Sequence, residues 1–422
     1  MKLEVDRNRL NSEIEELAAI SDAEAPAVTR IVFTPTDLKA RAWMKARCEE
    51  AGLLVRQDAI GNVFARWPGR ETSGAVVGTG SHIDAIPNAG KYDGVVGVLG
   101  GLEAIRTLQR SGFSPKHPIE LLLFTSEEPT RFGIGCLGSR LLSGSLSPDS
   151  ARKLVDKNTV SIEEVRRMAG LDGELEAVKL PAAYYKAFVE LHIEQGPLLE
   201  RQQVPLGIVS HIAAPASLRI SIEGRGGHAG AVLMPDRRDA LCAAAELILT
   251  VENEARTSGS IDAVATVGVC DVFPGAVNSI PSRVWLSVDI RDTSLERRDQ
   301  VMHAIDTACR SLAAKRQVNV RQELLNADAP ADCAATVIEA VTESCAGQGH
   351  RFIQMVSRAY HDSLFMSRIA PTGMLFIPCR NGYSHRPDEF AATEDIAAGT
   401  AVLAETLARW AAEQAPQRSP IG

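Results

Sequence analysis

The sequence predicts an α/β protein in which a mixed, mostly parallel sheet is flanked by helices and a ferredoxin-like domain is inserted. The chain has 422 residues, which is long enough for two domains. An apolar run at 75–79, a glycine-rich turn, a helical stripe at 95–105 and an apolar run at 119–125 form a β-α-β pattern. Such a unit implies parallel strands with a right-handed crossover.

The insertion is predicted from a change of pattern in the middle of the chain. Residues 213–327 show the order β-α-β-β-α-β, which is typical of a ferredoxin-like unit. We therefore assign residues 1–212 and 328–422 to one domain and 213–327 to the other. The expected elements of the insertion are strands at 218–223, 263–272, 282–289 and 317–323, and helices at 238–254 and 295–315.

The outer domain begins with an amphipathic helix at 5–21. A second helix at 35–51 follows Thr34 and has Pro35 in its first turn, a common helix start. A polar stretch ending at His361 has no assigned element. The remaining expected elements are strands at 53–57, 61–67, 187–197, 205–209 and 373–377, and helices at 334–345 and 393–412.

Composition excludes several classes of function. The chain is 45% hydrophobic and 23% charged, as in ordinary soluble globular proteins. The net charge of -8 argues against nucleic acid or an anionic membrane surface as the main partner. Eight scattered cysteines without a CxxC pair favour a reducing compartment. The N-terminus lacks the pattern of a signal peptide and no run is apolar enough to span a membrane, so we expect a cytoplasmic protein.

The stretch at 80–97 carries the first candidate site. It places His82, Asp84 and Asp93 in a glycine-rich turn between a strand and a helix. Imidazole and carboxylate groups together suit divalent transition-metal ions. A histidine and an aspartate two residues apart are more often a hydrogen-bonded loop, however, so further ligands are needed from elsewhere in the chain.

Those ligands are expected at the ends of other strands. Glu127 and Glu128 follow the strand at 119–125, His192 lies near the end of 187–197, and His385 follows 373–377. Ligands of open α/β sheets bind at the carboxyl ends of the strands. The sequence therefore predicts one ligand set at this edge: His82, Asp93, Glu128, His192 and His385.

This ligand set has enough donors for two divalent cations sharing a carboxylate. Such pairs lie ~3.5–4 Å apart and bind a bridging water. Glu127, the acid without a ligand role, is placed to take a proton from that water and pass it to a leaving nitrogen. Without a thiolate ligand, Mn²⁺, Zn²⁺ and Co²⁺ all remain open. The sequence has no GxSxG motif, so covalent acyl transfer is unsupported.

Two glycine-rich segments match nucleotide-binding patterns incompletely. Residues 133–138, GIGCLG, fit the dinucleotide fingerprint, but they lie several residues beyond the strand and no acidic residue follows at the expected distance. Residues 224–229, GRGGHA, are a similar near miss. We assign neither segment a nucleotide site.

Spaced motifs over nearly the whole chain resemble one enzyme group. They are GSHID at 80–84, GKYDG at 90–94, SEE at 126–128, ELHIEQGP at 190–197, GGHAG at 226–230 and YSH at 383–385. They look like the dinuclear metal amidohydrolases of the hydantoinase/carbamoylase group, which are related to aminoacylases. The resemblance implies a catalytic domain, a lid domain that also forms a homodimer, and two divalent metal ions per subunit, with Mn²⁺ favoured.

The resemblance also implies roles for the metal-site residues. By position, His82 and His192 would hold one ion, Glu128 and His385 would hold the other, and Asp93 would bridge the two. Asp84 would orient His82, and Glu127 would be the general base.

Substrate contacts are likewise implied by resemblance. His228, from the lid of the partner subunit, would polarise the scissile carbonyl, and Gln195 would touch the ureido group. Asn278 and Arg291 match the lid residues that hold the substrate carboxylate, and the planar guanidinium of arginine makes paired bonds with such a group.

Three stretches, 212–218, 227–235 and 357–366, resemble the ureidoglycolate amidohydrolases most closely. Carbamoylases and allantoate amidohydrolases usually carry Gly-Ala-Gly where this chain has Arg358-Ala359-Tyr360. We expect Tyr360 to hydrogen-bond a small hydroxylated substrate and assign His361 to the same pocket. The expected reaction is hydrolysis of ureidoglycolate to glyoxylate, ammonia and CO2 in purine catabolism.

Other functions stay open at this point. An N-carbamoyl-L-amino acid hydrolase or an allantoate amidohydrolase would use the same residues. A metal-binding relative without activity would require loss of Glu127 or of a ligand, and none is missing. A peptidase fits less well, because a lid arginine placed for one small carboxylate suits a compact substrate.

Overall fold

The computed structural model describes residues 3–71 and 75–412 and divides the chain into two compact units. The outer unit comprises Met1–Ser210, Asp332–Met355 and His361–Gly422. The inserted unit comprises His211–Ala331 and also Val356–Tyr360. Residues 1–2, 72–74 and 413–422 lie outside the described residues.

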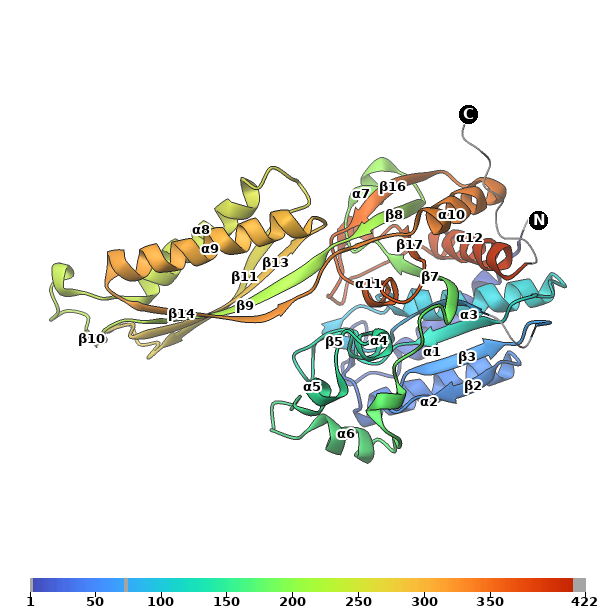
Figure 1. The fold of residues 1–422 in the computed structure, drawn as a ribbon, viewed down its shortest axis with the longest axis horizontal. Coiled ribbons are helices and arrows are strands. Elements are labelled where there is room, and N and C mark those ends of the chain that lie inside the picture. Colours follow the sequence, from blue (N-terminus) through green and yellow to red (C-terminus); the bar gives the residue numbers. More distant parts are fainter. Residues whose placement is uncertain (1–2, 72–74, 413–422) are drawn as a thin grey trace. The chain divides into compact units, whose positions relative to one another are not determined.

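The outer unit is built on one mixed sheet. Parallel pairing joins β17 to β7, β7 to β4 and β4 to β6, and the strands toward both edges pair antiparallel (Figure 1). The predicted mixed, mostly parallel sheet is confirmed. In spatial order the strands are β15 (Ala331–Asp332), β8 (Leu206–Ile212), β17 (Thr372–Ile377), β7 (Tyr185–Ile193), β4 (Val76–Ser81), β6 (Ile119–Leu123), β3 (Val63–Trp67) and β2 (Leu54–Gln57), with β16 (Phe352–Ser357) beside β8.

Helices cover both faces of this sheet. Successive side chains of a strand point to opposite faces, so neighbouring residues pack against different helices. Leu121 packs into one apolar cluster and its neighbour Leu122 into another. The first cluster includes residues of α1 (Arg7–Ala18), α2 (Pro35–Glu50), α3 (Val95–Arg110), α10 (Ala335–Gln348) and α12 (Thr393–Ala411). The second includes residues of α4 (Leu137–Ser143), α5 (Pro148–Arg152), α6 (Ile162–Met168) and α11 (Asp362–Met366).

Several short elements were not predicted. β1 (Val28–Arg30) pairs antiparallel with β5 (Ala85–Ala89), inside the stretch that was expected to be a turn. β5 contains Pro87 and Asn88, which are poor strand formers, so its sequence gives no strand signal. β16 lies in the stretch that has no expected element, and α11 begins just after that stretch, at Asp362.

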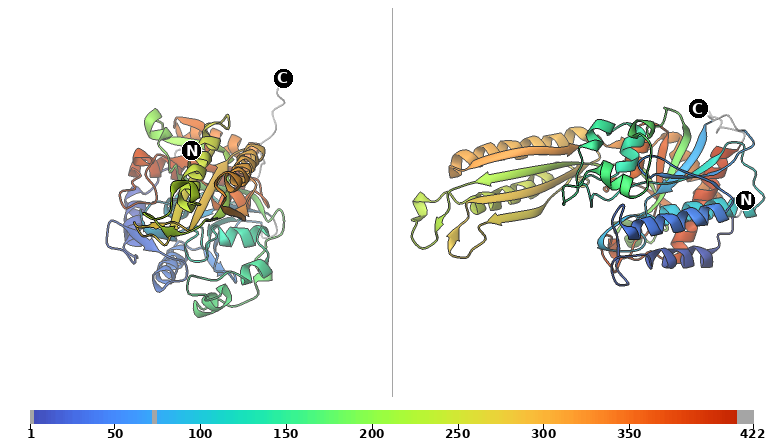
Figure 2. Two further views of the ribbon diagram at one scale, coloured as in Figure 1. Left: turned by 90° about the vertical axis from the view of Figure 1, so that its left-hand side faces the viewer. Right: turned by 90° about the horizontal axis from the view of Figure 1, so that it is seen from below.

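The inserted unit confirms the ferredoxin-like prediction. Its strands pair antiparallel in the order β11-β13-β9-β14, and α8 and α9 lie along one face (Figures 1 and 2). A two-stranded pair, β10 (Gly227–His228) with β12 (Ser279–Ile280), adjoins this sheet. In chain order the main elements are β9 (Ala214–Glu223), α8 (Ala240–Arg256), β11 (Val264–Phe273), β13 (Arg283–Asp292), α9 (Leu295–Arg316) and β14 (Asn319–Ala327).

Among the described residues, no helix combines the length and the apolar character that crossing a membrane requires.

Candidate metal centre

Neighbouring parallel strands bring the candidate ligands to one edge of the outer sheet. His82 directly follows β4, Glu127 and Glu128 follow β6, and His192 is the penultimate residue of β7. β6, β4 and β7 are adjacent and run in the same direction, so their carboxyl ends meet. Residues far apart in the sequence therefore converge because of strand order alone.

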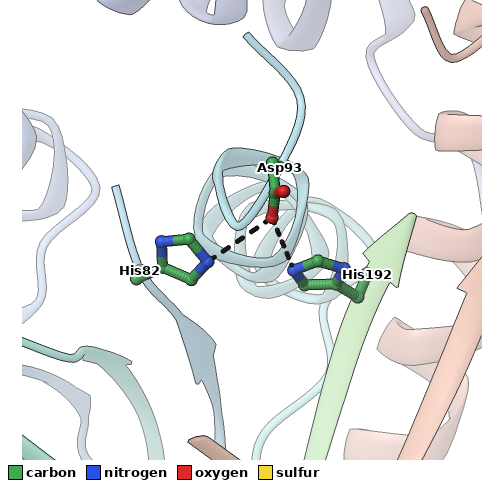
Figure 3. Close-up of side chains that lie close together, drawn as sticks. All are labelled: His82, Asp93 and His192. Carbon is green, nitrogen blue, oxygen red and sulfur yellow. Dashed lines mark ion pairs between the residues drawn. The ribbon is translucent and has the colours of Figure 1, made fainter. Parts of the chain in front are cut away.

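Asp93 stands between two imidazole rings (Figure 3). Its Oδ1 lies 3.6 Å from His82 Nε2 and 3.2 Å from His192 Nε2. The next residue, Gly94, has φ 66° and precedes α3. A Cβ at position 94 would lie 2.4 Å from His82 Nε2, so this close approach requires glycine.

The other oxygen of Asp93 faces a second group. His385 Nε2 lies 3.3 Å from Asp93 Oδ2 and 3.2 Å from Glu128 Oε1. The two sets of potential ligands are therefore His82, Asp93 and His192, and Asp93, Glu128 and His385. All five residues of the predicted ligand set are brought together, with the Asp93 carboxylate common to both groups.

The hydrogen bonds of the rings suit a bound cation. His82 Nδ1 lies 3.0 Å from the Asp84 carbonyl, and His192 Nδ1 lies 2.9 Å from the Ile193 carbonyl. A proton on each Nδ1 leaves a lone pair on Nε2. The Gly94 N–H donates to Nε2 of His192 at 3.1 Å. Both Nε2 atoms face the Asp93 carboxylate, so the space between them suits a positive charge, either a ring proton or a cation.

Spacing and charge agree with this reading. Ligand atoms of a tetrahedral ion with ~2.1 Å bonds are ~3.4 Å apart, close to the separations observed here. Burial by itself would lower the pKa of His82, but the carboxylates of Glu127, Asp93 and Asp84 together raise it well above its usual value. The site thus attracts positive charge, and its donor set fits divalent cations.

Side chains that the sequence analysis did not single out hold Asp93 in place. Burial opposes ionisation of this carboxyl, but hydrogen bonds to His192, His385 and His82 hold its pKa well below the usual range. The Ser384 hydroxyl lies 2.8 Å from Asp93 Oδ2, and Glu389 Oε1 accepts the Asp93 N–H at 3.1 Å. Ser384 is the middle residue of the YSH motif and Glu389 follows that motif, which was the only signal for them.

Gln195 also contacts Asp93. Its Nε2 donates to Asp93 Oδ2 at 2.7 Å. Its Oε1 is buried and has no hydrogen-bond partner among the described residues. This oxygen is therefore an unused acceptor in a side chain that contacts the shared carboxylate.

Asp84 connects both candidate acids to His82. Its carboxylate oxygens accept the N–H groups of Glu127 at 3.2 Å and Glu128 at 3.1 Å. Its backbone carbonyl contacts His82 Nδ1, whereas its carboxylate is 3.7 Å from that nitrogen. Burial raises the pKa of Asp84 to about 6. The side chain thus fixes the loop after β6, and the backbone orients the ring.

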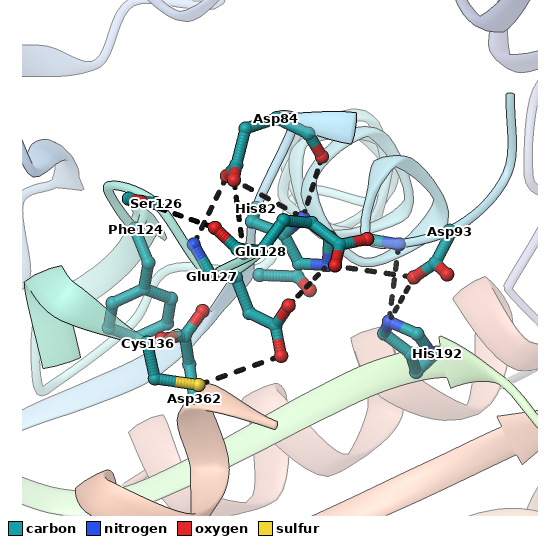
Figure 4. Close-up of polar contacts among 12 residues, drawn as sticks. His82, Asp84, Asp93, Phe124, Ser126, Glu127, Glu128, Cys136, His192 and Asp362 are labelled. Carbon is teal, nitrogen blue, oxygen red and sulfur yellow. Dashed lines mark hydrogen bonds and ion pairs between the residues drawn. The ribbon is translucent and has the colours of Figure 1, made fainter. Parts of the chain in front are cut away.

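Glu127 remains outside both ligand groups (Figure 4). Its Oε2 lies 3.8 Å from His82 Nε2, and its Oε1 accepts a hydrogen bond from the Cys136 thiol. Burial raises the pKa of Glu127 well above its usual value, and the nearby Glu128 carboxylate adds to this effect. A carboxylate at the edge of the ligand cluster with a raised pKa has the properties of a general base.

His361 lies beside the first ligand group. Its ring centroid is 4.4 Å from that of His192, and its side chain is buried. Glu190, His192 and His361 form a further cluster of potential ligands. Glu190 is hydrogen-bonded to the hydroxyls of Ser81 and Ser363, so it also braces β4 and α11.

The remaining candidate residues belong to the inserted unit and form two pairs. His228 lies in β10, and the adjacent Ala229 donates its N–H to the Asn278 carbonyl at 2.9 Å. Arg291, on β13, donates to Asp289 at 2.7 Å. The Tyr360 ring centroid lies 5.3 Å from Arg291 Cζ, within cation–π distance.

These two pairs lie at opposite ends of the inserted unit. His228 pairs with Ser279, which precedes the start of β13 at Arg283, whereas Arg291 lies near the other end of that strand. A rise of ~3.3 Å per residue makes the span from Arg283 to Arg291 ~26 Å. A small molecule therefore cannot touch both pairs within one copy of this unit, in which β10 lies at one end of the long strands (Figure 1).

The chain belongs to the peptidase family M20/M25/M40, whose model matches residues 78–409. Proteins of this family are metal-dependent, in agreement with the donor set of the site. The predictions of an enzyme and of a hydrolase acting on amide-type C–N bonds are confirmed.

Its relatives include a ureidoglycolate hydrolase from Arabidopsis thaliana, 52% identical over 96% of this chain and 87% of that protein. An N-carbamoyl-L-amino acid amidohydrolase from Geobacillus stearothermophilus is 39% identical, covering 96% of this chain and 98% of the relative. The crystal structure of AtUAH in complex with glyoxylate superimposes with a TM-score of 0.91 at 51% identity, covering 97% of this chain and 99% of that one. The resemblance inferred from the motifs is confirmed.

Proposed function

We propose that this chain hydrolyses ureidoglycolate in purine catabolism. The observation that carries the proposal is the 52% identity to a ureidoglycolate hydrolase over nearly the whole chain, against 39% to an N-carbamoyl-L-amino acid amidohydrolase over the same share. The site supports it independently, because five ligands and a separate glutamate match the needs of hydrolysis by an activated water.

The proposed reaction breaks the bond between the ureido carbonyl carbon and the nitrogen on C2. Water adds to the carbonyl carbon, and the leaving nitrogen takes a proton, which gives hydroxyglycine and carbamate. Carbamate decomposes to CO2 and ammonia, and hydroxyglycine loses ammonia to give glyoxylate. A solved structure of AtUAH is a complex with (S)-hydroxyglycine, the compound named as a product of this proposed step.

Each residue has a definite task in this proposal. One divalent cation would be held by His82 and His192, and a second by Glu128 and His385, with Asp93 contributing to both. Mn²⁺ is the favoured ion, and Zn²⁺ or Co²⁺ also suit these ligands. Bound cations would lower the pKa of a shared water and polarise the ureido carbonyl. Glu127 accepts the proton of the water and delivers it to the leaving nitrogen. Gln195 Oε1 accepts a hydrogen bond from the ureido N–H.

We further propose that residues 213–327 act as a lid and that the active enzyme is a homodimer. Arg291 binds the substrate carboxylate, and His228 polarises the carbonyl with Asn278 beside it. Because the ~26 Å span of β13 from Arg283 to Arg291 separates them in one inserted unit, a substrate of a few ångströms must take His228 and Arg291 from two copies of the chain. The C₂ symmetry of a dimer supplies both contacts to each site.

The cellular location proposed is the cytoplasm. All eight cysteines are free thiols, and six of them are buried. Free thiols persist in reducing compartments.

A substrate panel tests the proposal. The metal-free protein is reloaded with Mn²⁺, Zn²⁺ or Co²⁺ and assayed with ureidoglycolate, allantoate and N-carbamoyl-L-amino acids, with ammonia and glyoxylate as readouts. We expect the highest kcat/KM with ureidoglycolate. A higher value with an N-carbamoyl-L-amino acid or with allantoate would favour the alternative functions on the same scaffold.

A further inference from the structure

The glycine-rich segment at 133–138, which fits no nucleotide site, packs against the loop that carries Glu127. Three successive N–H groups, those of Cys136, Leu137 and Gly138, donate to three successive carbonyls of that loop. The acceptors are Glu127, Ser126 and Thr125, at 2.8, 2.9 and 2.8 Å. The start of α4 is thereby joined residue by residue to the end of β6.

The close approach of the two segments depends on their backbone. A Cβ at Gly138 would lie 2.0 Å from Asn62 Oδ1 and 2.7 Å from the Thr125 nitrogen. Ser126 and Cys136 both adopt left-handed conformations, with φ of 55° and 54°. Such conformations cost energy in residues other than glycine and persist where the surroundings impose them.

The Cys136 side chain adds a direct contact to Glu127. Its thiol donates to Glu127 Oε1 at 3.5 Å, an ordinary length for a sulfur donor, and it is fully buried. The other oxygen, Oε2, is the one that faces His82. Burial raises the pKa of the Cys136 thiol well above its usual value, so the thiol keeps the proton that it donates.

We propose that Cys136 is a positioning residue for Glu127. Its N–H fixes the Glu127 backbone carbonyl, and its thiol fixes the rotation of the carboxylate so that Oε2 points toward the ligand cluster (Figure 4). The inference rests on the proposed function, in which Glu127 is the general base. It assigns a task to the segment at 133–138 within the hydrolytic site.

Kinetics of two substitutions test the proposal. Cys136→Ala removes the donor, whereas Cys136→Ser keeps a hydroxyl donor of similar size. Because small displacements of a catalytic group are costly, we expect Cys136→Ala to lower kcat ~10-fold or more with KM changed less than ~2-fold. Cys136→Ser should recover part of the loss. Cys345→Ala, which truncates a buried thiol of α10, is the matched control and should leave kcat unchanged.

A double-mutant cycle and a spectroscopic readout separate positioning from general destabilisation. In the Glu127→Gln background, Cys136→Ala should cause no further loss of kcat. In the metal-free protein, the infrared S–H band found by difference against Cys136→Ser should move to higher frequency in Glu127→Gln, because an amide is a weaker acceptor than a carboxylate.

Opposite results would overturn the inference. Wild-type kcat in Cys136→Ala, equal losses in the Ala and Ser variants, or an unmoved S–H band would each contradict it while Glu127→Gln remains inactive. If Glu127→Gln instead retains wild-type kcat, the proposed function itself fails.

Discussion

The outer and inserted units gather their candidate residues in opposite ways. In the outer unit, residues from His82 to His385 meet around the Asp93 carboxylate. In the inserted unit, His228 and Arg291 are much closer in sequence, yet the length of β13 separates them. Adjacent parallel strands bring distant residues to one edge, whereas a long antiparallel strand holds near residues apart.

The difference indicates how the work of the protein is divided. One outer unit contains all five candidate ligands and the candidate base, so the proposed chemistry would need a single chain. One inserted unit cannot supply His228 and Arg291 to the same small substrate, so the proposed recognition would need two copies. The predictions below test first the outer unit and then the inserted unit.

The largest effect is expected at the carboxylate shared by both ligand groups. Loss of a side chain that only hydrogen-bonds a metal ligand already lowers the metal affinity ~10–100-fold. We therefore expect Asp93→Asn to lower metal affinity and kcat/KM by more than ~100-fold, as measured by metal analysis and the ammonia assay. Asp149→Asn, at an exposed aspartate of α5, is the control and should bind metal normally. Full metal content with full activity in Asp93→Asn would rule out a bridging role.

Subunit mixing tests the separation within the inserted unit. His228→Ala and Arg291→Ala should each lower kcat/KM ~100-fold or more, because each removes a contact to the developing or the fixed negative charge. Random re-association of the two variants should restore about one quarter of wild-type activity, since half the dimers are hybrids and each hybrid has one intact site. Mixtures that stay inactive would place both residues in one subunit's site.

The smallest effect is expected at Tyr360, where the two proposed roles predict different results. If its hydroxyl binds the substrate, Tyr360→Phe should reduce the preference for ureidoglycolate over N-carbamoyl amino acids. If its ring instead holds Arg291, Tyr360→Phe should leave that preference unchanged and Tyr360→Ala should raise KM ~2–30-fold, as a cation–π contact implies. Unchanged selectivity in Tyr360→Phe would discard the hydroxyl hypothesis.

Much of the fold was predictable because its signals are local. Helix α2 follows a Thr34 cap with proline in its first turn, and the β4-α3-β6 unit follows from two apolar runs around a helical stripe. β5 was missed because it contains strand-breaking residues and is defined by its pairing with β1, whereas β16, with the sequence FIQMVS, has a local strand signal that the sequence analysis did not use.

By itself, the sequence determined which histidines and acids lie at the strand ends and would gather at one edge. The carboxyl ends of parallel strands meet there whatever the order of the strands in the chain. Only the tertiary structure decided which atoms those residues present. It showed that Asp84 holds the acid loop by its carboxylate and His82 by its carbonyl, and that Cys136 contacts Glu127. Such contacts depend on register, loop conformation and side-chain rotation, which are set by packing across the whole unit and leave no local pattern in the sequence.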